Sequence, residues 1–226
     1  MNTLMIAASA AALSFAVLPD AAHADDLQNW EAVTVQVALG GPWKVTNETV
    51  ARSSDAKGFY ELENNLLLGY KLNKHITLWA GYTHNPNYSH GNFTVMEHRG
   101  RQQITFDNVL KVGPVNLSGR LRLEERWRDG VAGTGWRLRP YVKASMPFAN
   151  HGKTALVVTH ESFLNLNKTS FQKVSGEDRM RNFVGINSAL MKHISVEMGY
   201  LEQHGFVPAK PDTNDHVVSV ALTASF

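Results

Sequence analysis

The chain has 226 residues, enough for one domain of ordinary size, and it contains no cysteine. The absence of cysteine excludes a disulfide scaffold, a thiolate zinc site and cysteine catalysis. Lysine and arginine number 22 against 20 acidic residues, so the formal charge of +2 gives no reason to expect a nucleic-acid partner.

The N-terminus has the pattern of a secretion signal. Residues 4–18 form an apolar stretch, and the small-x-small sequence Ala22-His23-Ala24 follows it. We therefore predict a cleaved signal peptide over residues 1–24 and a single mature domain over residues 25–226. A buried apolar helix is the alternative, but no later segment offers a partner helix. Beyond this stretch, no apolar run approaches the roughly 20 residues of a membrane-spanning helix.

The first half of the mature chain alternates between apolar and polar residues with a period of two, which is typical of β-strands. Each strand candidate is bounded by turn residues, and residues 85–92 are expected to form a long loop. The candidates in this half are residues 28–39, 42–52, 66–72, 76–82 and 93–107.

The clearest alternation lies in the second half, at residues 115–127, VNLSGRLRLEERW. A loop is expected at residues 128–135, and further strand candidates follow it. They are residues 136–148, 153–165, 180–190, 194–200 and 218–226. Short turns are expected at 149–152 and 192–193, and longer loops at 166–176 and 206–215.

Aromatic residues favour a barrel in a membrane over a soluble barrel. Trp127 and Trp136 lie on the apolar face at both ends of one loop, while Tyr70, Phe148 and Phe226 lie at the opposite ends. Such girdles are typical of the two edges of a lipid-facing band, and short and long connections also alternate along the chain. We predict an all-β, closed, antiparallel up-and-down transmembrane β-barrel in a bacterial outer membrane, surrounded by its lipids.

The number of strands is not fixed by the pattern. Eleven segments can be counted, but a bacterial barrel with both termini on one side needs an even number. Either residues 28–39 are not a full wall strand, or residues 166–180 contain another. We predict 10–12 strands, with twelve as the best value. The final residues, VSVALTASF, resemble the C-terminal targeting strand of outer-membrane barrels, so the barrel assembly machinery is an expected partner of the strand ending at Phe226.

Several short motifs occur in order along the mature chain. They are Trp30, Gly69-Tyr70-Lys71-Leu72, Gly81-Tyr82, Glu97-His98-Arg99, residues 120–126, Arg137-Leu138-Arg139-Pro140, Glu161 before Phe163, Arg179 with Arg181-Asn182, and Gly199-Tyr200. In this order they resemble a family of outer-membrane barrels catalogued as domain of unknown function 2490. The resemblance covers nearly the whole mature chain and implies a barrel in the outer membrane, but it implies no substrate.

Charged residues expected to face the barrel lumen are the strongest polar signal. They are Glu97, Arg99, Arg101, Arg120, Arg122, Glu124, Arg126, Arg137, Arg139, Glu161, Arg179, Arg181 and Glu197. One interpretation is a salt-bridged network that fills the lumen. The other is a solute pathway whose arginines favour small anions. We predict a passive channel or small-solute transporter, and the alternative is a structural or adhesive barrel with a plugged lumen.

His160 and Ser162 suggest a different function. They share the outward face of one strand, and a histidine that deprotonates a serine is the basis of nucleophilic catalysis. Their spacing resembles the His-x-Ser motif of outer-membrane phospholipase and lipid A deacylase barrels, although Phe163-Leu164 replaces the phospholipase's Asn-Gly. Asn182 is the candidate third residue. A lipid hydrolase is therefore an alternative function, against two interfacial polar residues. No metal or cofactor is expected from the other histidines.

Overall fold

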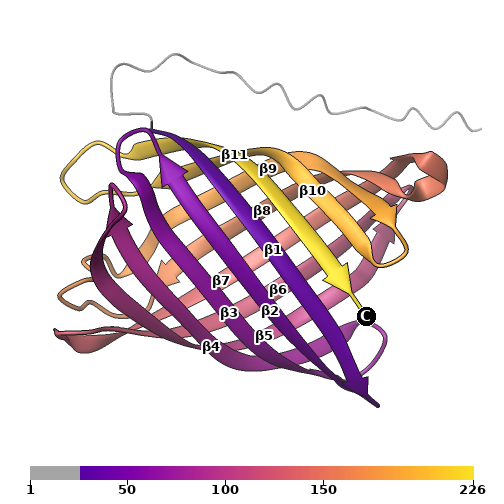
Figure 1. Cartoon of the computed structure of the whole chain (residues 1–226), viewed down its shortest axis with the longest axis horizontal. Coiled ribbons are helices and arrows are strands. Elements are labelled where there is room, and N and C mark those ends of the chain that lie inside the picture. The colour runs from indigo at the N-terminus through magenta and orange to yellow at the C-terminus, as the bar shows by residue number, and fades with distance from the viewer. Residues whose placement is uncertain (1–25) are drawn as a thin grey trace, which may run out of the picture.

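The computed structural model describes residues 26–226 and consists of one closed β-barrel of eleven strands (Figure 1). The signal peptide and cleavage site predicted from the sequence lie outside the described residues. The strands are β1 (Asp26–Gly40), β2 (Trp43–Ser54), β3 (Gly58–Lys71), β4 (Ile76–Ser89), β5 (Asn92–Val112), β6 (Val115–Arg128), β7 (Val131–Ala149), β8 (Thr154–Asn165), β9 (Gly176–Met191), β10 (Ile194–Gly205) and β11 (Thr213–Ser225). A three-residue 3₁₀ turn, η1 (Asn150–Gly152), joins β7 to β8. In this part of the chain, no helix has the length and apolar character needed to cross a membrane.

The closed all-β barrel is confirmed, with two corrections to its details. The strand number is eleven rather than twelve, because residues 28–39 lie in a full wall strand and residues 166–175 add none. Consecutive strands pair antiparallel, but β1 and β11 close the barrel in parallel, with Glu31 opposite Val220. An odd number of alternating strands makes the first and last run in the same direction, as their arrows do in Figure 1.

Two of the expected long loops are instead tight hairpins. Strand β4 continues to Ser89, and only His90 and Gly91 separate it from β5. Both have positive φ, 50° and 77°, as a type I′ hairpin turn requires. Only Asp129 and Gly130 separate β6 from β7. The sequence pattern missed these strand ends because residues 85–89 do not alternate clearly between apolar and polar, and residues 131–135 contain two glycines that have no side chain to mark a face. The longer connections 166–175 and 206–212 are close to the predicted loops.

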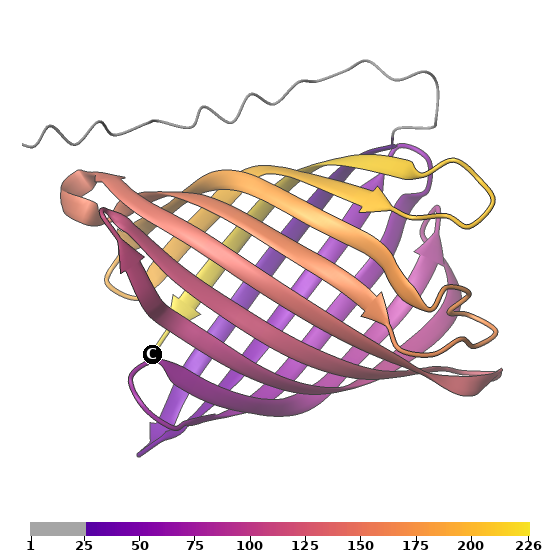
Figure 2. The same cartoon turned by 180° about the vertical axis from the view of Figure 1, so that it is seen from behind.

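The two ends of the barrel differ. The C-terminus lies at one end, together with the short turn at residues 192–193 and η1. The longer connections 166–175 and 206–212 lie at the other end, which we call the loop end (Figure 2). Strand β1 starts at the loop end, because Asp26 pairs with Asp215 just after the 206–212 loop.

Side chains are distributed in the reverse of a soluble barrel. The inward face is polar, and Glu124, Glu97 and Arg101 are 1% exposed or less. The outward face is apolar, and many large side chains on it are more than one third exposed. They include Val33, Leu66, Leu68, Leu78, Leu121, Val142, Leu156, Val158, Val184, Ile186, Met198, Val220 and Leu222. The period of two along each strand produces both faces at once.

Candidate functional site

Glu97 is the centre of one half of the lumen network. Its carboxylate lies 2.7 Å from Arg99 Nε, 2.9 Å from Arg126 Nη2 and 2.7 Å from Arg128 Nε. Arg99 also reaches Glu63 on β3, with Nη1 at 2.9 Å from the carboxylate. These contacts join β3, β5 and β6 through one continuous set of charge-assisted hydrogen bonds.

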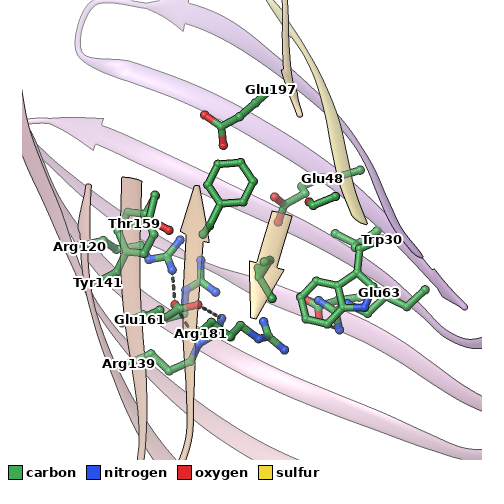
Figure 3. A pocket seen from close by; sticks show the side chains of 17 residues that line it. Trp30, Glu48, Glu63, Arg120, Arg139, Tyr141, Thr159, Glu161, Arg181 and Glu197 are labelled. Atoms are coloured by element: carbon green, nitrogen blue, oxygen red, sulfur yellow. Dashed lines mark hydrogen bonds and ion pairs between the residues drawn. The ribbon is translucent and has the colours of Figure 1, made fainter. Parts of the chain in front are cut away.

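Glu124 and Glu161 organise the other half. Arg137 Nη2 lies 2.5 Å and Arg139 Nη1 lies 2.7 Å from the Glu124 carboxylate. Arg139 also donates to Glu161 at 2.9 Å, and Glu161 accepts a second hydrogen bond from Arg120. Figure 3 shows Glu161 held between these two arginines. Paired charges that are this deeply buried hold the wall strands together.

The charged residues predicted to face the lumen do lie on inward faces, and most of them meet in this network. Glu197 stands apart, in a half-buried pair with Lys143 at 2.8 Å. Arg52, Glu61 and Glu63, which were not predicted from the sequence, form further ion pairs on β2 and β3. The signal was present for Glu61 and Glu63, because they occupy odd positions, opposite to the even apolar positions of residues 66–72. The predicted strand started too late to include them, whereas Arg52 lies at the last position of the predicted strand 42–52.

Inward side chains of residues 26–226 line at least two cavities. One of about 220 Å³ lies among Glu48, Arg120, Tyr141 and Glu197, and Figure 3 shows Arg181 reaching into it between Glu161 and Trp30. A second, of about 680 Å³, lies at the loop end, where Asp26, Tyr60, Arg179 and Asp215 are among its lining residues. Three residues line both cavities and so form the boundary between them: Trp30, Arg52 and Arg181. Because the lumen is divided and densely paired, the predicted passive channel gains no support from the packing and stays a prediction.

The outward face carries a three-residue hydrogen-bond chain. Ser162 Oγ lies 3.2 Å from His160 Nε2, and His160 Nδ1 lies 2.8 Å from Asn182 Oδ1. His160 and Asn182 are direct cross-strand partners on β8 and β9, which is why their side chains meet. The candidate third residue is thus brought together with the predicted pair.

The atoms involved determine which group donates and which accepts in the Ser162–His160–Asn182 hydrogen-bond chain. Asn182 Oδ1 only accepts hydrogen bonds, so His160 must donate from Nδ1. In the neutral imidazole, Nε2 is then free to accept the Ser162 hydroxyl proton. Serine, histidine and an orienting acceptor in this order form the arrangement of a serine hydrolase.

The aromatic residues predicted to form the membrane girdles lie at the two ends of the barrel. At the loop end Trp136 is half-exposed, and Trp127 stacks on His98 with ring centroids 5.7 Å apart. At the other end Tyr70 packs edge-on against Trp43, and Phe148 and Phe226 are exposed. Across residues 26–226, no group of three or more histidine and acidic side chains is arranged to hold a metal ion.

Comparison with known proteins places the chain in a family. The model of the family described as "Protein of unknown function (DUF2490)" matches residues 27–214. The chain belongs to this family. Among curated proteins, this DUF2490 chain is similar to an uncharacterized protein of Methylorubrum extorquens, with 27% identity over 225 residues. The aligned region covers 98% of this chain and 97% of the relative. No solved structure matches.

Proposed function

We propose that this protein is an outer-membrane β-barrel that hydrolyses acyl esters at the membrane surface. Ser162 is the nucleophile, His160 the general base and Asn182 the residue that orients the imidazole. The observation that carries the proposal is the Ser162–His160–Asn182 hydrogen-bond chain on the outward face. A lone polar pair at a membrane interface would not require this defined order of donor, bridging imidazole and acceptor.

The location in the outer membrane is part of the proposal. It is supported by the apolar outward face, the polar lumen and the aromatic residues at both ends of the barrel. The apolar stretch before Ala22-His23-Ala24 and the C-terminal strand ending at Phe226 support export and assembly. A lumen filled by ion pairs suits a rigid support for an external site, because the wall strands that carry the site cannot slide or open easily.

The chemistry follows from the polarity of the hydrogen bonds. Ser162 Oγ attacks the ester carbonyl as its proton passes to His160 Nε2, and the protonated imidazole then gives that proton to the departing alcohol. A water molecule then attacks the acyl carbonyl as His160 takes its proton, and His160 returns that proton to Ser162 Oγ as the carboxylic acid leaves. Asn182 holds the ring in the productive tautomer through both steps.

The surroundings indicate a lipid-like substrate. Val158 and Val184 form the next outward cross-strand pair beside His160 and Asn182, and they are 49% and 47% exposed. Ser162 lies three residues before the end of β8, near the loop end, where water is available. An ester carbonyl at Ser162 would therefore have its acyl chain along the apolar wall and its headgroup in water.

The test is ester hydrolysis by the refolded mature chain in neutral detergent micelles, with phosphatidylcholine and a p-nitrophenyl acyl ester as substrates. We expect hydrolysis by the wild type, loss of it in Ser162→Ala, and labelling of Ser162 by a fluorophosphonate probe, located by mass spectrometry. His98→Asn is the matched control, because this outward histidine contacts Tyr82 and Asp129 but no serine. We expect that variant to keep its activity.

Two results would overturn the proposal. One is a folded wild type that neither hydrolyses these esters nor reacts with the probe. The other is activity that persists in Ser162→Ala. Folding is checked in each sample by heat-modifiable gel mobility, so that inactivity of an unfolded variant is not counted.

A further inference from the structure

Two lumen arginines differ from all the others that the structure describes. Nine lumen arginines of residues 26–226 lie within 4.0 Å of a carboxylate oxygen, whereas Arg179 and Arg181 do not. Both come from β9 and both line the 680 Å³ cavity at the loop end. Guanidinium groups in a protein interior are unfavourable without a negative partner, so this pair lacks the compensation that the rest of the lumen has.

Aromatic side chains and one amide hold the two guanidinium groups in place. Arg181 stacks 4.4 Å from the Trp30 ring and 4.6 Å from the Phe163 ring, and Arg179 lies 5.7 Å from Phe163. Gln203 Oε1 accepts hydrogen bonds from Arg181 Nε at 2.9 Å and from Arg179 Nη1 at 3.4 Å. Each guanidinium has five donors and gives one of them to Gln203, and both side chains line the cavity.

The carboxylates around the same cavity are largely engaged elsewhere. Glu61 pairs with Arg52, Asp215 accepts a hydrogen bond from Gln203 at 2.6 Å, and Asp26 accepts one from the backbone of Ala56 at 3.0 Å. Asp55 is the fourth carboxylate that lines the cavity. The cavity volume is within the range of small-molecule sites. The rim acids would repel a highly charged anion, which favours one of low charge.

We infer that Arg179 and Arg181 form a binding site for a small phosphate- or carboxylate-bearing anion at the loop-end mouth of the lumen. The planar forks of the two side chains suit bidentate contacts to such oxyanions. The site is separate from Ser162, which lies on the outward face. Within the lumen, anion binding is therefore expected at this pair rather than in the central network, because the arginines of that network already have carboxylate partners.

The test is isothermal titration calorimetry of the refolded mature chain with inorganic phosphate, in a neutral detergent without phospholipid and at constant ionic strength set by chloride. We expect saturable binding by the wild type. In Arg179→Gln and in Arg181→Gln the affinity should fall about 10- to 100-fold, as expected for the loss of hydrogen bonds to a charged group. Arg181→Lys should lie between wild type and Arg181→Gln, because lysine keeps the charge and loses the planar fork.

Arg128→Gln is the matched control, because it also removes a cation near the loop end, but one paired with Glu97. We expect its phosphate affinity to stay within about twofold of the wild type, since Glu97 keeps Arg99 and Arg126. Glycerol 3-phosphate is the second probe, and tighter binding of it than of phosphate would identify a lipid headgroup as the source of the anion. Absence of saturable binding by the folded wild type, or equal binding by Arg179→Gln and Arg181→Gln, would overturn the inference.

Discussion

At the residue scale, the stability of the barrel depends on carboxylates that serve several arginines at once. Glu124 is completely buried and accepts hydrogen bonds from Arg137 and Arg139, with Arg122 at 3.8 Å. Removing one such carboxylate leaves several buried positive charges without compensation, whereas removing one of the arginines leaves the carboxylate with other partners. The acidic residues are therefore the more sensitive members of the network.

We expect Glu124→Gln to destabilise the folded barrel by about 3–5 kcal/mol, because the neutral amide cannot balance the arginines around it. The control is Glu197→Gln, whose carboxylate pairs with Lys143 and whose side chain is 26% exposed. That variant should lose about 1 kcal/mol or less, since solvent screens the pair. Unfolding in guanidinium chloride, followed by heat-modifiable mobility, measures both. Equal losses would contradict the central role of Glu124.

Asn182 allows a second prediction at this scale. In Asn182→Ala the imidazole of His160 loses its acceptor at 2.8 Å and can rotate or take the other tautomer. We expect kcat for ester hydrolysis to fall about 10²–10⁴-fold with little change in KM, because positioning of the general base acts on the chemical step. A rise in KM with unchanged kcat would instead indicate that Asn182 contacts the substrate.

At the element scale, neighbouring strands approach closely where glycines face inward. Gly199 on β10 lies against β9, where an added Cβ would be 2.3 Å from the Val184 carbonyl oxygen and 2.5 Å from the Gly185 Cα atom. The ring of Phe183 covers the same place, with Cζ at 2.8 Å from the position of that Cβ. Backbone atoms cannot move aside as a flexible side chain can, so only glycine fits here.

We expect Gly199→Ala to separate β9 from β10 and to lower stability by about 1–3 kcal/mol. Gly100→Ala is the matched control, because its added Cβ would be no closer than 3.7 Å to any neighbour, an ordinary contact. Midpoints of denaturant unfolding compare the two variants. The strand packing described for β9 and β10 would be contradicted by a Gly199→Ala barrel as stable as the wild type.

At the scale of the whole molecule, parallel closure of β1 on β11 has a topological consequence. The start of β1 lies at the loop end, and Phe226 lies at the opposite end. If the loop end faces the outside of the cell, Asp26 and the next residues of β1 lie outside as well. The native chain has no cysteine, so single introduced cysteines can report on each end without background.

For intact cells we expect Lys210→Cys, in the 206–212 loop, to react with a membrane-impermeant maleimide. Lys74→Cys, in the turn between β3 and β4, should react only after the outer membrane is opened. Both native side chains are exposed, so accessibility within the protein is matched. The reverse pattern would invert the orientation, and reaction at neither site in opened cells would contradict a location in the outer membrane.

The filled lumen leads to a prediction for transport. Because Glu97, Glu124 and Glu161 tie the inner wall together with arginines, we expect planar bilayers with the refolded protein to show no steady ohmic steps. Steps with anion preference would instead support the passive channel predicted from the sequence and would require the network to open. In that case the Arg179→Gln and Arg181→Gln variants should lose the anion preference.

The sequence by itself determined the all-β barrel, the inward and outward faces of most strands, and many of the charged residues directed to the lumen. These features follow from a period of two, which is a local property that each strand expresses independently of its neighbours. The same alternation placed His160 and Ser162 on one outward face. It missed strand ends such as residues 85–89, where apolar and polar residues do not alternate clearly.

Only the tertiary structure decided which residues meet across strands. Cross-strand register brought Asn182 to His160, and it left Arg179 and Arg181 without carboxylates while Glu124 received several arginines. The tertiary structure also set the strand number at eleven and closed the barrel by parallel pairing of β1 with β11. The physical reason is that register and closure depend on hydrogen bonds between segments far apart in the chain, and shifting one strand by a single residue would turn its inward side chains outward.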